Sequence, residues 1–154
     1  MLSDDVFRTH LAATFAELLK VANALSDVAE VSHVETARYA RLSLLPHAQG
    51  ACPVEMMMRT DQHYDIEIGH QFYEDCPMTG FAEFVPLIEA IARGDVVQRH
   101  HVSAATGTER SVETIVRLPG GTVWRKGHIH TEVARAITEQ NTVFEDHRYV
   151  AYRR

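Results

Sequence analysis

Histidine is the residue type whose placement in this sequence most readily suggests chemistry. The chain has ten histidines among 154 residues, and only one residue separates His128 from His130. They follow a segment expected to be a strand, where side chains two residues apart project from the same face. Both imidazoles could then reach one divalent metal ion. His128 and His130 are therefore a candidate metal site, the alternative being two ordinary histidines at the start of the next helix.

Three further residues could extend this site. His100 and His101 lie on a neighbouring expected strand, and Glu113 lies on the strand expected to pair with the one that carries His128. A two-residue turn at 120–121 would place Glu113 directly opposite His128. Histidines with a carboxylate are a set that binds metal or carries out acid–base catalysis.

A second candidate is a ligand pocket formed by Tyr64, His70, His100 and Trp124. The strand expected over 64–72 is the clearest in the chain, and its alternation places Tyr64 and His70 on the apolar face. If this strand and the one carrying His100 curve around a shared cavity, the two imidazoles, Tyr64 and Trp124 would line it. The alternative is that each of these residues packs as an ordinary member of the core or sheet.

Composition and charge exclude several classes of protein. The net charge is −6 and the fifteen basic residues are scattered, so a nucleic-acid binder is not expected. No stretch approaches the roughly 20 apolar residues of a membrane helix, and the first residues do not resemble a signal peptide. Cys52 and Cys76 lack metal-like spacing, so we expect reduced thiols and a cytoplasmic location.

Periodicity predicts three helices and several strands. The first helix is expected to begin after Ser3, which can cap it, and to end near 26–27. The second is expected to end at Gly94, and the third to cover 131–140. Strands are expected at 37–45, 54–59, 64–72, 96–105, 110–118, 122–129 and 149–152.

The order of these elements predicts one α+β domain over residues 1–154. Runs of hairpin strands between helices favour a mainly antiparallel sheet of about six or seven strands, with an N-terminal helix and two further helices packed on one face.

No motif specifies a reaction or a cofactor beyond the divalent metal considered for His128 and His130. One hypothesis is an acidic, homodimeric binding or interaction domain that holds a protein partner or a small molecule on its sheet or in an apolar pocket. The other is a small enzyme, metal-dependent or not, with a histidine-lined pocket in a half-open α+β barrel.

Overall fold

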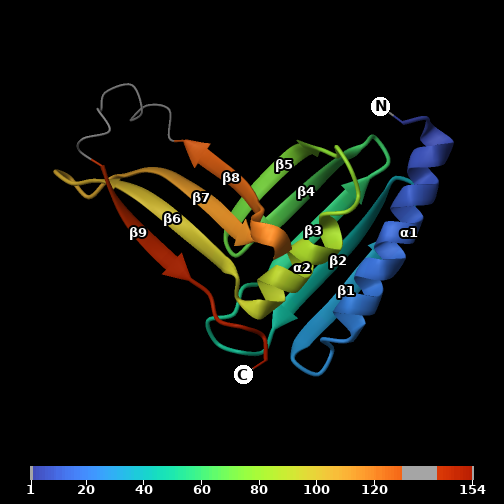
Figure 1. Cartoon of the computed structure of the whole chain (residues 1–154), viewed down its shortest axis with the longest axis horizontal. Helices are drawn as coiled ribbons and strands as arrows, with labels where there is room; N and C mark the ends of the chain where they lie inside the picture. Colours follow the sequence, from blue (N-terminus) through green and yellow to red (C-terminus); the bar gives the residue numbers. More distant parts are fainter. Residues whose placement is uncertain (1, 130–141, 154) are drawn as a thin grey trace.

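The computed structural model describes residues 2–129 and 142–153, in which it contains two α-helices and nine β-strands. The helices are α1 (Asp4–Asn23) and α2 (Phe84–Arg93). The strands are β1 (Ala29–Glu35), β2 (Tyr39–Pro46), β3 (Val54–Arg59), β4 (His63–Ile68), β5 (Gln71–Pro77), β6 (Val96–Ser103), β7 (Glu109–Arg117), β8 (Val123–Ile129) and β9 (Thr142–Arg148). They form two antiparallel sheets, a first sheet in the order β1-β2-β3-β4-β5 and a second sheet in the order β8-β7-β6-β9 (Figure 1).

Alternating side chains give the first sheet one buried face. Val54, Met56 and Met58 of β3 are buried, whereas the residues between them are partly exposed. Leu42 and Leu44 of β2 are buried in the same way. α1 and α2 cover this face (Figure 1), and each large apolar side chain buried there contributes roughly 1.5–3 kcal/mol. The opposite face of the first sheet is open to solvent.

Both helices of the described residues were predicted, but α1 ends at Asn23 rather than near 26–27. α1 buries one apolar stripe at helical spacing, made of Phe7, Leu11, Phe15, Leu18 and Ala22. Ser3 occupies the N-cap position, but its side chain makes no capping hydrogen bond. α2 ends at Gly94, whose φ of 82° lies in the left-handed region that favours glycine. Neither described helix is long and apolar enough to cross a membrane.

The hairpin of β7 and β8 is confirmed, but its register differs from the prediction. The short 3₁₀ turn η1 (Pro119–Gly121) connects the two strands with three residues. Glu113 therefore pairs with Gly127, and His128 pairs with Val112. The predicted pairing of Glu113 with His128 is wrong, because the loop has one residue more than the two-residue turn expected.

Buried polar side chains join the two sheets. The Gln98 side-chain amide donates to the Ile68 carbonyl oxygen at 2.7 Å and to Thr114 Oγ1 at 3.3 Å, and its Oε1 accepts from the Tyr149 hydroxyl at 2.7 Å. Thr114 Oγ1 also shares a hydrogen bond of 2.8 Å with the Tyr73 hydroxyl. Because buried polar groups need partners, this network favours one way for the sheets to meet.

The continuous strand predicted over 64–72 is wrong. β4 ends at Ile68, the chain reverses at Gly69 and His70, and β5 follows. Gly69 has a φ of 62°, and a β-carbon there would collide with the hydroxyl of Tyr149. The alternation of apolar residues runs on across this turn and so mimics one longer strand.

The predicted arrangement of a single sheet of six or seven strands is also wrong. The described residues form nine strands in two sheets, with two helices. β1 and β9 were not predicted, because both are edge strands with mainly exposed side chains and no regular apolar alternation. The strand predicted over 149–152 is reduced to an isolated bridge between Val150 and Ala51. The third predicted helix, 131–140, lies outside the described residues.

Candidate functional site

Tyr64 and Trp124, two of the predicted ligand-binding residues, meet in the interior. Trp124 Nε1 donates to the Tyr64 hydroxyl at 3.1 Å, and both side chains are buried. Burial raises the pKa of Tyr64. The cavity beside the two rings has about 30 Å³, which is room for little more than one water molecule. The rings thus largely fill this space themselves, and their role in ligand binding stays a prediction.

The other two predicted ligand-binding residues lie on different sheets. His70 is exposed in the turn between β4 and β5, so its predicted position on an apolar strand face is wrong. It lines a shallow hollow of about 270 Å³ together with Glu55 and Glu67 of the first sheet. His100 lies on β6 of the second sheet, with Nδ1 3.2 Å from Glu109 Oε2.

His128, a predicted metal ligand, supports the contact between β8 and β5. Its ring stacks on Tyr73 with centroids 4.5 Å apart, and Nε2 donates to the carbonyl oxygen of Phe72 at 2.6 Å. His130 lies outside the described residues. Within 2–129 and 142–153, no group of three or more His, Cys, Asp and Glu side chains could hold a metal ion. A metal at His128 and His130 stays a prediction.

Glu113 belongs to an ion-pair group on the other face of the second sheet. Its carboxylate accepts from Arg125 Nε at 3.1 Å, and its Oε1 lies 3.5 Å from His101 Nε2. Alternation along β6 places His101 and His100 on opposite faces. The structure therefore does not bring Glu113 and His128 together.

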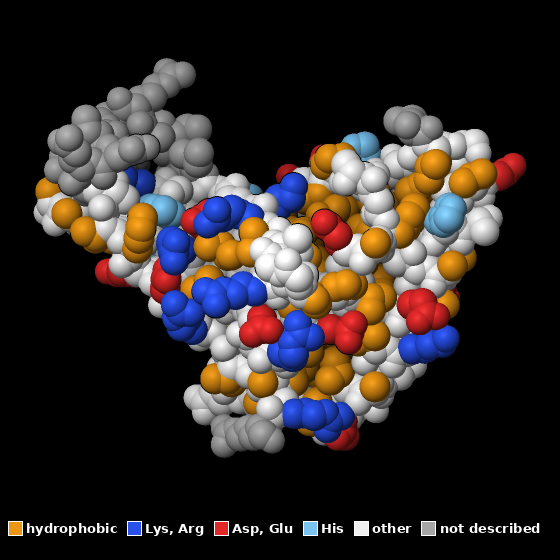
Figure 2. Space-filling model, in the orientation of Figure 1, with side chains coloured by type: hydrophobic (Ala, Val, Ile, Leu, Met, Phe, Trp, Pro, Cys, Tyr) orange, Lys and Arg blue, Asp and Glu red, His pale blue; other side chains and the backbone are white. Residues whose placement is uncertain are grey.

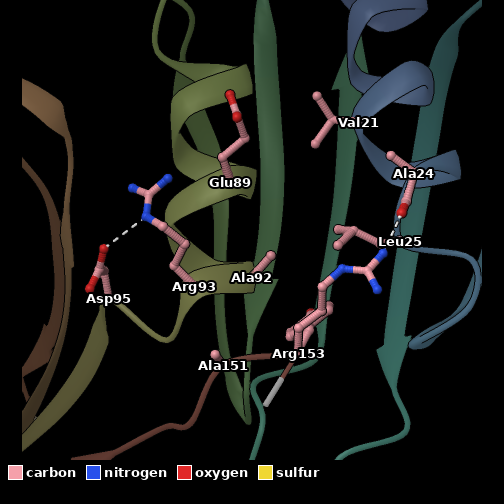
Figure 3. A pocket seen from close by; sticks show the side chains of 10 residues that line it. Val21, Ala24, Leu25, Glu89, Ala92, Arg93, Asp95, Ala151 and Arg153 are labelled. Carbon is pink, nitrogen blue, oxygen red and sulfur yellow. Dashed lines mark hydrogen bonds and ion pairs between the residues drawn. The ribbon is translucent and has the colours of Figure 1, made fainter.

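A groove of about 760 Å³, which the sequence did not predict, lies between the C-terminal halves of α1 and α2. Figure 3 shows side chains from both helices facing it, with the C-terminal segment along one end. It is lined by Val21, Ala24, Leu25, Glu89, Ala92, Arg93, Asp95, Ala151, Tyr152 and Arg153. A mostly apolar lining with a few charged groups is typical of binding sites.

The groove exists because small side chains line it and because the C-terminal segment folds back. Ala24, Ala92 and Ala151 contribute one alanine from each of the three segments that line it. The Tyr152 backbone N–H donates to the carbonyl oxygen of Ala92 at 2.8 Å, and its hydroxyl donates to the carbonyl oxygen of Cys52. These contacts depend on the tertiary arrangement, so a periodicity argument within one element could not find them.

One end of the groove is closed by an ion pair. Arg153 binds both carboxylate oxygens of Asp27 and donates to the carbonyl oxygen of Ala24 at 2.8 Å. The hydrogen bond from Arg153 lowers the pKa of Asp27, so this carboxylate stays ionised at neutral pH.

The remaining charges give the groove a slight negative bias. Arg93 pairs with Asp95 at 3.1 Å at the side of the groove away from α1 (Figure 3). Glu89 is exposed on α2. Two carboxylates, Glu89 and Asp95, and two guanidinium groups line the groove, and both arginines are paired with aspartates, so Glu89 is the lining charge that the ion pairs of the described residues do not neutralise. The C-terminal ends of α1 and α2 also lie here and add partial negative charge. The groove should attract a positively charged group.

Comparisons with known proteins assign no family to this chain. Its sequence matches no protein-family model, and neither a curated protein nor a solved structure matches it significantly. Function is therefore inferred from the geometry and charge of the molecule itself.

Proposed function

We propose that this chain is a binding domain that holds an apolar segment of a partner protein, carrying a basic side chain, in the groove between α1 and α2. The groove itself supports the proposal. Its volume of about 760 Å³ is large enough for several side chains, and most of its lining is apolar.

The position of the groove favours a protein segment as the occupant. α1 and α2 lie side by side on the first sheet (Figure 1), and grooves of this kind receive the apolar face of an amphipathic helix. Val21 on α1, Leu25 in the turn after α1 and Ala92 on α2 would contact the apolar side chains of such a segment. Apolar anchors filling a desolvated pocket usually provide most of the binding energy in a protein interface.

Charge determines which apolar segments fit best. The exposed carboxylate of Glu89 can form an ion pair with a lysine or arginine of the bound segment. A basic residue beside the apolar anchors of the segment would pair with this carboxylate and would raise the rate of association.

We place this function in the cytoplasm. Cys52 and Cys76 are both free and buried, which fits a reducing compartment. The enzyme hypothesis has weaker support, because Tyr64 and Trp124 meet in the core while His70 and His100 lie on separate sheets.

Selection of peptides against the intact protein tests the proposal. Random peptides of about 12 residues, long enough for three turns of helix, are selected on the wild-type protein. Their dissociation constants are then measured by fluorescence anisotropy. We expect selected peptides to combine apolar residues at helical spacing with a lysine or arginine.

A matched pair of tryptophan variants locates the binding site. Ala92→Trp fills the groove and should weaken binding by at least about tenfold, the equivalent of about 1.4 kcal/mol. Ala16→Trp, on the exposed side of α1, should leave the affinity unchanged. Glu89→Gln should weaken the binding of peptides that contain a basic residue more than the binding of the same peptides with that residue replaced by alanine. If the peptides bind both tryptophan variants equally well, the groove is not the binding site.

A further inference from the structure

The solvent face of the first sheet is acidic. Alternation and strand register place four carboxylates on it, those of Glu30, Glu55, Asp65 and Glu67, and Asp75 joins them through its hydrogen bond from Arg59. Within residues 2–129 and 142–153, the guanidinium groups of Arg41 and Arg59 share this face. Arg59 binds Asp65 and Asp75, and Arg41 Nε lies 3.5 Å from Glu55.

Glu55 and Glu67 are two neighbouring carboxylates on this face, and Arg41 is paired with Glu55. They are direct partners in the register of β3 and β4, a position where like charges destabilise a sheet. Both line the hollow of about 270 Å³ described above, together with Ser43 and His70. A hollow with two carboxylates beside it is suited to a guanidinium group from outside the chain.

The solvent face of the second sheet has the opposite charge. Alternation places Arg99, Arg117, Arg125 and Arg148 on it, against two carboxylates, Glu113 and Asp146. The side chains of Arg125 and Arg148 remain 54% and 68% exposed. Figure 2 shows Lys and Arg side chains gathered over the second sheet. A cationic face is notable on a chain with a net charge of −6.

We propose that a second copy of this chain docks the arginine face of its second sheet on the acidic face of the first sheet, with Arg125 or Arg148 entering the hollow beside Glu55 and Glu67. The second copy fits because one molecule carries both complementary faces. This inference goes beyond the proposed function and does not use the groove.

The arrangement of the faces determines the kind of assembly. The helices cover one side of the first sheet (Figure 1), so its acidic solvent face lies on the other side, whereas the arginine face belongs to the second sheet. A contact between two different faces is heterologous, so copies join head to tail. Strand spacing and rise give each face roughly 500 Å², or about 1,000 Å² buried per contact, which is near the lower limit for a specific interface. The association is therefore weak and depends on concentration and salt.

Sedimentation equilibrium of the full chain tests the proposal. At about 50 mM NaCl the average mass should rise above 17.4 kDa with increasing protein concentration. At about 500 mM NaCl the apparent dissociation constant should rise at least about tenfold, because salt screens exposed charges. A wild-type protein that stays at 17.4 kDa under all these conditions would overturn the proposal.

Charge reversal identifies the faces. Arg125→Glu/Arg148→Glu and Glu55→Lys/Glu67→Lys should each abolish self-association, and an equimolar mixture of the two variants should restore it. Asp5→Lys/Glu17→Lys changes the charge equally on the exposed side of α1 and should have no effect. Circular dichroism shows whether each charge-reversal variant folds. If one does not, the milder variants Arg125→Gln/Arg148→Gln or Glu55→Gln/Glu67→Gln take its place, and these should weaken self-association.

Two outcomes would contradict the pairing of the faces. Association that persists in both reversed variants would show that other surfaces are used. A wild-type monomer that binds polyglutamate or a single-stranded oligonucleotide through Arg125 and Arg148 would assign the arginine face to another acidic partner and overturn self-docking.

Discussion

Replacing Gln98 with leucine should loosen the junction between the two sheets. The Gln98 side chain makes three hydrogen bonds, to the carbonyl oxygen of Ile68, to Thr114 and to the hydroxyl of Tyr149. It is 3% exposed, so water cannot replace these partners without opening the interface. Leucine keeps a similar volume but can make none of the three bonds.

The expected loss follows from this count of bonds. Each hydrogen bond contributes about 1 kcal/mol net, and a buried partner left unpaired costs about 1–3 kcal/mol. Thr114 keeps its bond to Tyr73, whereas the Ile68 carbonyl loses its bond from Gln98. We therefore expect Gln98→Leu to lower the free energy of unfolding by about 3 kcal/mol.

Equilibrium unfolding in urea measures this loss. Gln71→Leu, a partly exposed position at the start of β5, is the matched control and should change the free energy of unfolding by less than about 0.5 kcal/mol. A double-mutant cycle with Tyr149→Phe should give a coupling energy of about 1 kcal/mol. A Gln98→Leu effect as small as that of the control would refute the proposed junction.

Three further predictions concern backbone, charge and thiol. Gly69→Ala should lower the free energy of unfolding by at least about 1 kcal/mol, because φ is positive and the added β-carbon meets a tyrosine hydroxyl, whereas Gly80→Ala, with open space around it, should have little effect in urea unfolding. Because the pKa of Asp27 is lowered in the folded protein, its pair with Arg153 stabilises the fold above about pH 4, and this contribution is lost as the pH falls through the folded-state pKa. The difference in melting temperature between the wild type and Asp27→Asn should therefore shrink as the pH falls over that range. A difference that stays constant would contradict the ion pair. Burial raises the pKa of Cys52 to about 12, so it should resist Ellman's reagent in the native protein at about pH 8 and react after denaturation, with rapid native reaction as the contrary result.

Elements specified by local pattern could be predicted from the sequence. The apolar stripe of α1, the glycine end of α2 at Gly94, strand β3 and the hairpin of β7 and β8 all follow from periodicity or turn chemistry. The register of the hairpin could not be predicted as reliably, because one extra residue in the loop changes the cross-strand partner of Glu113 from His128 to Gly127.

The incorrect predictions concern segments where tertiary contacts override the local sequence pattern. The turn at Gly69 interrupts an apolar alternation that continues on both sides, and its φ together with the nearby Tyr149 hydroxyl explains the glycine. The groove depends on the spacing of two helices and on Tyr152 fixing the C-terminal segment against Ala92. Of the predicted ligand-binding residues, the fold brings together Tyr64 and Trp124, through packing that no single-element pattern contains.

Methyl NMR during titration with a selected peptide tests the central proposal most directly. The methyl groups of Val21 and Leu25 line the groove, whereas Leu45 is 54% exposed on the solvent face of the first sheet and serves as an internal control. We expect the Val21 and Leu25 signals to shift in proportion to the bound fraction while Leu45 stays unchanged. Shifts at Leu45 with unchanged Val21 and Leu25 would contradict binding in the groove.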